Sequence, residues 1–365
     1  MFSNIYKNKK VLITGNTGFK GSWLTVWLLK LGAKVYGLSK DIPTKPSMFE
    51  VLNLNKKIIH FENDVRNLNS VLQIINDVKP DFIFHLAAQA IVSKSYLEPI
   101  ETISTNVIGT TNILEALRLY KKKCIGIIIT SDKCYDNVEW IWGYKETDRL
   151  GGKDMYSGSK GAAELVIKSY YHSFFKHSDN IRLASARAGN VIGGGDWAQD
   201  RIVPDCIRAW SNNEFVEIRS PSSTRPWQHV LEPLSGYLTL GSKLYEDNNL
   251  NGESFNFGPL PHYSHTVIEL IKDLSKYLNK NKRFKMCKIT QDNKFQEAGL
   301  LKLNCDKALI LLNWIPTLSY EKLIEFTANW YVNYYLDNID MYNFTLSQID
   351  EYEKLAFKKE IQWTK

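Results

Sequence analysis

The stretch "VLITGNTGFKG", residues 11–21, decides the fold of this chain. A run of branched apolar residues leads directly into a turn with glycines at Gly15, Gly18 and Gly21. Without Cβ atoms, these positions let the backbone approach a pyrophosphate closely. The helix that follows presents its free N–H groups to the same anion. A glycine triplet at the first strand-to-helix turn therefore predicts a dinucleotide-binding site.

Working outward from this turn, the first half of the chain alternates short apolar runs with helical patterns. Alternation of this kind predicts parallel strands joined by right-handed crossovers. Continuous apolar strands indicate a sheet that is covered on both faces. We expect an α/β fold, a Rossmann-type doubly wound parallel sheet. The expected strands are 10–14, 34–39, 58–64, 82–88, 124–130 and 182–188, and the expected helices are 21–32, 68–78, 106–122 and 156–176.

Beyond residue 190 the composition and the secondary-structure pattern of the chain change. Glycine and proline become frequent, and the helical patterns are shorter, as at 265–278 and 320–336. We expect residues 1–190 to form an NAD-binding Rossmann domain, to which later segments return. Residues 191–365 should form mainly a smaller cap that binds the substrate. The pattern of 347–365 leaves a terminal helix and a frayed end both open.

Composition excludes several classes of protein. The formal charge of +7, from 46 basic and 39 acidic residues, suits anionic small molecules, and no basic stripe indicates nucleic acid. No apolar run approaches the roughly 20 residues of a membrane span, and the N-terminus has no signal-peptide core. The five cysteines are odd in number and show no CxxC spacing, which predicts reduced thiols in the cytoplasm and no metal site.

Side chains at the ends of the expected strands suggest the rest of the cofactor site. After the second strand, Asp41 favours an unphosphorylated ribose, whereas Lys40 would accept a 2′-phosphate; we expect NAD. Asp64 and Val65 should clasp the adenine, and small residues follow the fourth strand. The expected cofactor-binding residues are Gly15, Thr17, Gly18, Phe19, Lys20, Gly21, Ser39, Asp41, Asp64, Val65, Leu86, Ala87, Ala88 and Asn106, together with Tyr156 and Lys160.

Two motifs carry candidate catalytic residues. In "DMYSGSKGAAEL", Tyr156 and Lys160 are spaced i, i+4 and share a helix face. A lysine beside a tyrosine stabilises the phenolate, which is a base for an alcohol. In "TSDKCYDN", an Asp–Lys pair, Asp132 and Lys133, follows an apolar strand. That pair is either a surface ion pair or an acid and a base at the open end of a sheet.

These motifs, with "RAGNVIGGGDWAQDRIVPD" and "RPWQHVLEPLSGYL", resemble the extended short-chain dehydrogenase/reductase family. Within it the chain is similar to nucleotide-sugar 4,6-dehydratases, in particular the branch that acts on CDP-glucose. The resemblance implies that Tyr156 takes the proton of the sugar's 4-hydroxyl while carbon 4 is oxidised by NAD⁺. Asp132 would then protonate the departing 6-hydroxyl, and hydride would return to carbon 6.

The resemblance also exposes one departure. In the pattern of most such dehydratases, the residues at this position are Thr-Asp-Glu, whereas this chain has Ser131-Asp132-Lys133. Lys133 as the base at carbon 5 is therefore a hypothesis, and electrostatic stabilisation of an enolate is the alternative. Thr130 and Ser131 compete for the hydroxyl that bonds the 4-oxygen, and the position of Ser131 next to the Asp–Lys pair favours it.

The same resemblance implies a substrate side and a homodimer. Arg187 and Asn190 would lie near the nucleotide sugar, and Arg225 suits its pyrophosphate because a planar fork matches two oxygens. Pairing would use two long helices, including that of Tyr156. The expected substrate-binding residues are Gln89, Asn190, Trp197, Arg201, Arg219, Arg225 and His229, and for His229 a structural role is favoured over one as acid or base.

Other functions remain open from the residues alone. An epimerase or reductase of nucleotide sugars needs Tyr156 and Lys160 but no acid–base pair. A dehydratase for another nucleotide sugar would carry the same motifs. A non-catalytic protein that senses NAD would have no need of a phenolate base.

Overall fold

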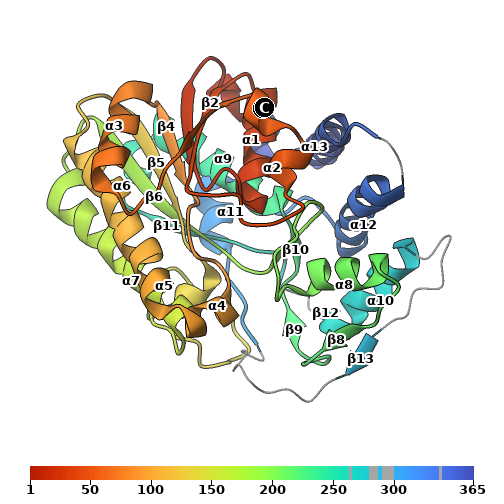
Figure 1. Ribbon diagram of the computed structural model, residues 1–365. Helices are drawn as coiled ribbons and strands as arrows, with labels where there is room; N and C mark the ends of the chain where they lie inside the picture. Colours follow the sequence, from red (N-terminus) through yellow and green to blue (C-terminus); the bar gives the residue numbers. More distant parts are fainter. Residues whose placement is uncertain (262, 264, 279–286, 290–299, 337–338) are drawn as a thin grey trace.

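The core of the molecule is a seven-stranded sheet, in which every paired strand is parallel (Figure 1). The computed structural model describes residues 1–365 except 262, 264, 279–286, 290–299 and 337–338. The strand order β11-β6-β5-β4-β1-β2-β3 confirms the predicted doubly wound fold. The strands are β1 (Lys10–Thr14), β2 (Lys34–Ser39), β3 (Ile59–Glu62), β4 (Phe82–His85), β5 (Cys124–Ile129), β6 (Ile181–Ala188) and β11 (Ser254–Phe257).

Helices cover both faces of this sheet because both faces of its strands are apolar. On one face, side chains such as Leu12, Ile83 and Ile128 join a core with three helices, and on the other face Ile13 and Phe84 join a larger core. The first set is α3 (Leu68–Val78), α6 (Gly109–Leu119) and α7 (Met155–Tyr170). The second set is α1 (Phe19–Lys30), α9 (Leu231–Glu246) and α13 (Met341–Lys358).

The strand order reverses between β1 and β4, where a ligand crevice forms in open α/β sheets. Thr14 and His85, the last residues of these strands, are register partners. The Thr14 hydroxyl and the His85 Nδ1 are 2.7 Å apart, and the His85 Nε2 lies 3.1 Å from the Thr110 hydroxyl. Burial lowers the pKa of His85 to about 3, so the imidazole is neutral in this chain of hydrogen bonds.

A smaller second part lies beside the carboxyl edge of the sheet (Figure 1, lower right). It contains α8 (Ile202–Ser211), α10 (Val267–Leu278) and α12 (Tyr320–Leu336), with three small two-stranded sheets. The chain enters this second part after β6, returns to the main sheet for α9 and β11, and then enters the second part again. The small sheets pair β7 (Val191–Ile192) with β10 (Gln228–His229), β8 (Val216–Ile218) with β13 (Cys287–Ile289), and β9 (Thr224–Arg225) with β12 (His265–Thr266).

The C-terminal segment, which the sequence left open, forms a helix. α13 packs on α1, where the Trp27 indole N–H donates to Glu353 Oε1 at 2.8 Å. Beyond the helix, the Trp363 ring stacks on Phe2 with ring centres 4.9 Å apart. The two ends of the chain are therefore joined through one aromatic cluster.

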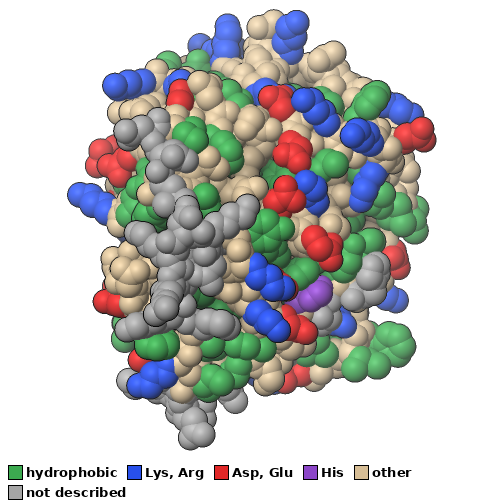
Figure 2. Space-filling model, turned by 90° about the vertical axis from the view of Figure 1, so that its right-hand side faces the viewer, with side chains coloured by type: hydrophobic (Ala, Val, Ile, Leu, Met, Phe, Trp, Pro, Cys, Tyr) green, Lys and Arg blue, Asp and Glu red, His purple; other side chains and the backbone are tan. Residues whose placement is uncertain are grey.

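The surface carries charges of both signs. On the face drawn in Figure 2, basic and acidic side chains are interspersed. Among the described residues, no helix is long and apolar enough to cross a membrane. The same part of the chain holds no cluster of three or more His, Cys, Asp or Glu side chains that suits a metal ion.

Candidate active site

The glycine-rich turn brings two backbone segments into close contact. Gly15 has φ +74°, and a Cβ on it would lie 2.8 Å from the Ala87 nitrogen. A Cβ on Gly21 would lie 2.1 Å from the Gly15 carbonyl oxygen. Gly18 is the N-cap of α1, which begins at Phe19. The turn thus needs glycine for its own geometry, and the 12-residue helix directs free N–H groups at the crevice.

Thr17 and Ser39 hold this turn against the end of β2. The Ser39 hydroxyl donates to Asn16 Oδ1 at 2.8 Å, and the Thr17 hydroxyl donates to the Asp41 carbonyl at 2.7 Å. Both hydroxyls are buried in this scaffold. The Asp41 carboxylate is exposed and lies 3.8 Å from the Lys40 ammonium. Of these four residues, only Asp41 and Lys40 carry a charged side chain at this end of the crevice.

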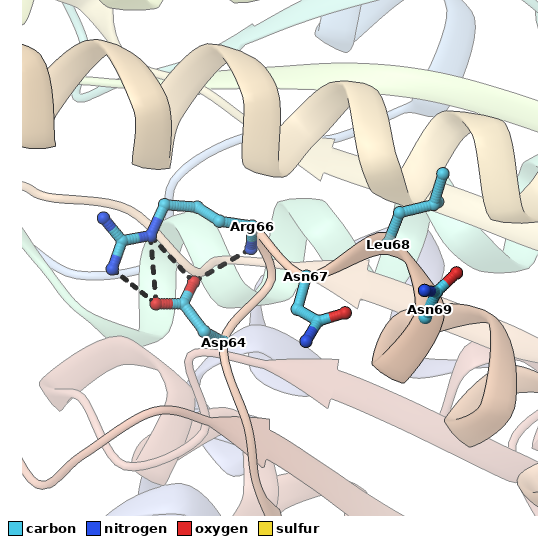
Figure 3. A pocket seen from close by; sticks show the side chains of 5 residues that line it. All are labelled: Asp64, Arg66, Asn67, Leu68 and Asn69. Carbon is cyan, nitrogen blue, oxygen red and sulfur yellow. Dashed lines mark hydrogen bonds and ion pairs between the residues drawn. The ribbon is translucent and has the colours of Figure 1, made fainter.

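A surface pocket opens at the start of α3, next to β3 (Figure 3). Asp64 accepts hydrogen bonds from the Arg66 backbone N–H at 2.9 Å and from its guanidinium at 2.6 Å. Val65 is buried, and a Cβ on Gly109 would lie 2.8 Å from its Cγ2. The pocket is lined by Asp64, Arg66, Asn67, Leu68 and Asn69, so it belongs to the expected adenine end and holds none of the expected catalytic residues.

Asn106 links the segment after β4 to α7. Its side chain exchanges hydrogen bonds with the Gln89 backbone at 2.8 and 3.0 Å and donates to the Ser159 hydroxyl at 2.8 Å. The Gln89 amide donates to Ile91 and Thr102, so its hydrogen bonds are made within the fold. Leu86, Ala87 and Ala88, also expected at the cofactor, form the segment after β4.

Strand alternation separates the two candidate hydroxyls at the end of β5. The Thr130 hydroxyl donates to the buried Glu164 carboxylate. The Ser131 hydroxyl turns the other way, donates to Asp132 Oδ1 at 2.9 Å, and accepts the Lys133 N–H at 3.2 Å. Ser131 is therefore the hydroxyl that lies with the Asp–Lys pair.

Asp132 and Lys133 contact each other, but they are not an ordinary surface pair. Asp132 is 2% exposed, and its Oδ1 lies 3.5 Å from the Lys133 ammonium. A Cβ on Gly189 would lie 2.9 Å from Asp132 Oδ2, so glycine there makes room for the carboxylate. The pair begins a single 3₁₀ turn, Asp132–Cys134, at the carboxyl edge of the sheet.

α7 brings Tyr156 and Lys160 close to Ser131 and to the Asp–Lys pair. The helix is capped by the Asp154 carboxylate, which accepts the Ser157 N–H at 2.9 Å. Both Tyr156 and Lys160 are buried, and the Ser131 hydroxyl lies close enough to Tyr156 to lower its pKa.

The electrostatics of Tyr156 differ from the sequence expectation. Burial raises the pKa of Tyr156 above its usual value. The largest opposing contribution to this pKa comes from the charge of Lys133, not from Lys160, which was expected to supply it. Burial also lowers the pKa of Lys160 to about 8, because the interior disfavours its charge.

Two further cations converge on this cluster. Lys20, in the first turn of α1, interacts electrostatically with Arg201, Asp132, Lys160 and Lys133. Burial, followed by the charge of Arg201, lowers the pKa of Lys20 to about 7, while Asp132 opposes this. Arg201 donates to Asp196 at 2.8 Å, and its charge also acts on Tyr156. The sequence predicts that Lys20 binds the cofactor and that Arg201 binds the substrate. The structure also places Lys20 near Asp132 and Arg201 near Tyr156.

Among the expected substrate residues, several are anchored within the second part. Trp197 is buried against Trp330, Tyr331 and Tyr334. His229 is fully buried and meets Trp23 and Phe326 edge-on, a position that favours its structural role.

The remaining expected substrate residues are more open. Arg219 lies 3.7 Å from Asp200, and Arg225 donates to the Thr224 carbonyl at 3.0 Å. The Asn190 carbonyl accepts the Gln228 N–H at 3.1 Å where β7 and β10 pair, and its side chain is half-buried.

Arg187, expected near the nucleotide sugar, instead lies in the interior. It makes two hydrogen bonds to Glu164, at 2.9 and 2.8 Å, and one to the Tyr135 hydroxyl at 2.8 Å. Its side chain is 3% exposed, so its hydrogen bonds are made within the fold, and its expected place near the nucleotide sugar stays a prediction. Glu164 was not among the expected site residues. It lies one helical turn beyond Lys160, and this i, i+4 spacing indicates that the two side chains share a helix face.

Fold and site together define a class: an extended short-chain dehydrogenase/reductase, with its glycine-rich turn, its Tyr–Lys pair on α7 and its additional Asp–Lys pair. The family model described as "GDP-mannose 4,6 dehydratase" matches residues 12–327. This chain belongs to that family.

Individual relatives agree with this assignment. The chain is 44% identical over 332 residues to a CDP-glucose 4,6-dehydratase of Salmonella typhimurium, covering 90% of this chain and 92% of that protein. It is 27% identical to a CDP-paratose 2-epimerase of Salmonella typhi, covering 88% and 98%. A dTDP-glucose 4,6-dehydratase of Bacillus anthracis, solved in complex with NAD, shares the fold with a TM-score of 0.73 at 20% identity, covering 88% and 96%.

Proposed function

We propose that this protein is an NAD-dependent dehydratase that converts CDP-D-glucose to CDP-4-keto-6-deoxy-D-glucose. The single observation that carries the proposal is the contact between buried Asp132 and half-buried Lys133 beside Tyr156 and Ser131. Oxidation at carbon 4 needs a base from the protein and a hydride acceptor, whereas loss of water also needs an acid and a second base or cation. The 44% identity to a CDP-glucose 4,6-dehydratase supports the choice of nucleotide and sugar.

The residues at the glycine-rich turn fit a dinucleotide. Any side chain at Gly15 or Gly21 would collide with backbone, and α1 directs free N–H groups at the crevice. Asp41 remains exposed beyond β2, where an acidic residue suits a ribose hydroxyl. When bound, NAD supplies the hydride acceptor for carbon 4 and the donor for carbon 6.

Tyr156 is proposed to take the proton of the 4-hydroxyl, with Ser131 orienting the same oxygen. Lys133 assists because its charge acts against the rise in the pKa of Tyr156 that burial causes. Lys160 shares a helix face with Tyr156 and is proposed to hold the nicotinamide ribose. Lys20 lies near the same cluster and is only partly protonated at neutral pH, because its pKa is lowered to about 7.

Asp132 is proposed to protonate the departing 6-hydroxyl, because it is a buried carboxyl in contact with both Ser131 and Lys133. Lys133 acts on carbon 5, either as the base or as the cation that stabilises the enolate. Arg201, Arg219, Arg225 and Asn190 are proposed to hold the nucleotide diphosphate, so residues 1–190 serve mainly the cofactor and 191–365 mainly the substrate.

A homodimer in the cytoplasm is the proposed working form. The neighbouring helices α4 (Val92–Leu97), α5 (Pro99–Ile103) and α7 expose Leu97, Ile100 and Leu165, which are 79%, 80% and 55% exposed. Large exposed apolar side chains on adjacent helices suit a contact between copies. Light scattering of Ile100→Glu against the unchanged chain tests this, and an unchanged mass would reject these helices as the interface.

One experiment tests the chemistry. The purified protein is mixed with CDP-, dTDP-, GDP- and UDP-glucose in deuterated water, and the products are followed by NMR. We expect dehydration of the CDP sugar, with deuterium at carbon 5. Inversion without water loss would make the protein an epimerase, and dehydration of a different donor would reassign the nucleotide.

A further inference from the structure

Glu101 on α5 joins the ends of two neighbouring strands through two cations. Its Oε1 accepts a hydrogen bond from the Lys40 ammonium at 2.8 Å, just after β2. Its Oε2 accepts from the Arg66 guanidinium, just after β3. One carboxylate thus occupies the two basic side chains that follow adjacent strands at the carboxyl edge of the sheet.

The remaining partners of these cations are also carboxylates. Arg66 makes three further side-chain bonds to Asp64, at 2.6, 3.0 and 3.1 Å, and its Nη1 lies 3.5 Å from the Ser104 hydroxyl. Lys40 lies 3.8 Å from Asp41. Three carboxylates surround two cations, so the cluster carries a net charge of −1. Without Glu101 the cluster would be neutral, and Lys40 and the Nη1 group of Arg66 would no longer be bonded to this carboxylate.

The cluster adjoins the proposed dinucleotide site. Asp41, its neighbour Lys40 and the glycine-rich turn are tied together, because the Thr17 hydroxyl donates to the Asp41 carbonyl at 2.7 Å. In Rossmann-type proteins, an acidic residue about 20 positions after the turn bonds the ribose 2′-hydroxyl of NAD, whereas a nearby basic residue accommodates the 2′-phosphate of NADP. This chain carries both kinds of residue in one place.

We propose that Glu101 is a specificity-determining residue that makes the site select NAD over NADP by withholding Lys40 and Arg66 from a 2′-phosphate. The inference rests on the proposed cofactor site. It assigns the choice to a carboxylate 60 positions beyond Asp41 in the chain, on a different element.

A purely structural role is the competing explanation, and the exposure of the cluster speaks against it. The side chains of Lys40 and Arg66 are 41% and 31% exposed, and that of Glu101 is 25% exposed. Ion pairs this open to water contribute little to folding. Once Glu101 no longer occupies them, however, the two cations are free to attract a dianionic phosphate that binds beside them.

The test measures binding, not turnover. Affinities for NAD⁺ and NADP⁺ are determined by calorimetry for the unchanged chain, for Glu101→Gln and for Glu98→Gln. Glu98 is the matched control, because it lies three positions earlier and pairs with Lys94 at 3.3 Å on the surface. We expect Glu101→Gln to improve the affinity for NADP⁺ relative to NAD⁺ by about tenfold or more, as loss of one nearby charge implies. Glu98→Gln should leave the ratio unchanged.

A double-mutant cycle separates release of the cations from simple loss of negative charge. Lys40→Met should leave NADP⁺ binding nearly unchanged in the native background, where Lys40 is occupied. In the Glu101→Gln background the same substitution should remove most of the gain. Equal effects of Lys40→Met in both backgrounds would overturn the proposal, even if Glu101→Gln proved poorly stable.

Failure of the inference and failure of the cofactor site give different results. If the unchanged chain binds NAD⁺ and Glu101→Gln leaves the NAD⁺/NADP⁺ ratio as it was, Glu101 does not set the selection. Equal affinity of the unchanged chain for both dinucleotides would also overturn it. If the unchanged chain binds neither, the proposed NAD site itself is wrong, and the inference falls with it.

Discussion

The Arg187 guanidinium and the Glu164 carboxylate form a two-bond ion pair beside the end of β5, the strand that Ser131 and Asp132 follow. The two bonds measure 2.9 and 2.8 Å, and both side chains are almost completely buried. The pair joins β6 to α7, and Thr130 adds a hydrogen bond from β5. The helix that carries Tyr156 and Lys160 is therefore fixed against the end of β5, and the Asp–Lys pair follows directly after that strand.

Breaking this pair should destabilise the protein strongly. Arg187→Met leaves the Glu164 carboxylate buried without its cation, and we expect the free energy of unfolding to fall by about 3–5 kcal/mol. Urea denaturation measures the change. Arg118→Met, which removes an exposed pair with Glu115, is the control and should cost less than about 1 kcal/mol. Similar losses for the two variants would show that the buried pair has no special role.

The adjacent hydroxyls of Thr130 and Ser131 should separate stability from activity. Thr130→Ala removes a partner of buried Glu164, so we expect a loss of about 1–3 kcal/mol in unfolding free energy. Ser131→Ala removes the hydroxyl beside Tyr156 and should reduce kcat by about tenfold to a hundredfold. Thermal melting and steady-state kinetics on both variants check this. The reverse pattern would make Thr130 the hydroxyl that contacts the substrate.

Lys133 should set the pH dependence of oxidation. Its positive charge opposes the rise in the pKa of Tyr156 that burial causes. Lys133→Met removes that charge, so the pKa of Tyr156 should rise further and the ascending limb of the rate should move to higher pH. The rate of NAD reduction after mixing with substrate, measured across pH, reports this limb.

A second readout on the same variant addresses dehydration. Deuterium incorporation at carbon 5 should become slow in Lys133→Met, whether Lys133 is the base or the cation that stabilises the enolate. Lys153→Met, a substitution just before α7, serves as the control. An unchanged pH limb together with unchanged incorporation would remove Lys133 from the mechanism.

Glu232 should make stability fall as the pH rises. Burial raises its pKa to about 7, although N–H groups of Leu318 and Thr317 oppose this. The usual value is 4.5, so the folded state holds the proton more tightly than the unfolded chain does. The resulting stabilisation is complete below about pH 4.5 and is lost as the pH rises through about 7.

The comparison with Glu232→Gln isolates this group, because every other titration is common to both proteins. By about pH 8 the unchanged chain should have lost about 3 kcal/mol relative to the variant, compared with about pH 4. Denaturant midpoints across that range measure the difference. Parallel pH profiles would show that Glu232 titrates alike in the folded and unfolded states.

The strands and the helix that carries Tyr156 and Lys160 were predictable because their signals are local. Apolar runs of five or six residues, a glycine triplet and an i, i+4 spacing all lie within a few positions of one another. Tertiary contacts had no such signal: nothing near Arg187 indicates that its partner is Glu164, on another element. The same holds for Lys20, whose neighbours Asp132 and Arg201 come from distant loops.

Residue type alone also failed to distinguish core from site. Trp197 and His229 stand in motifs that suggest a ligand, yet both are buried among aromatic rings. An indole or an imidazole serves either purpose equally well. Only the packing partners, which come from α1 and α12, decide between the two roles.

The position of β11 has a consequence for synthesis. This strand, residues 254–257, pairs with β6, which ended at residue 188. At the usual pace of translation, the edge of β6 waits unpaired for several seconds while the intervening residues are made. α1 waits still longer for its partner α13, which is made more than 300 residues later, at Met341–Lys358. A nascent chain thus exposes an open strand edge, and the face of α1 that later packs on α13, until the residues between these partners have been synthesised.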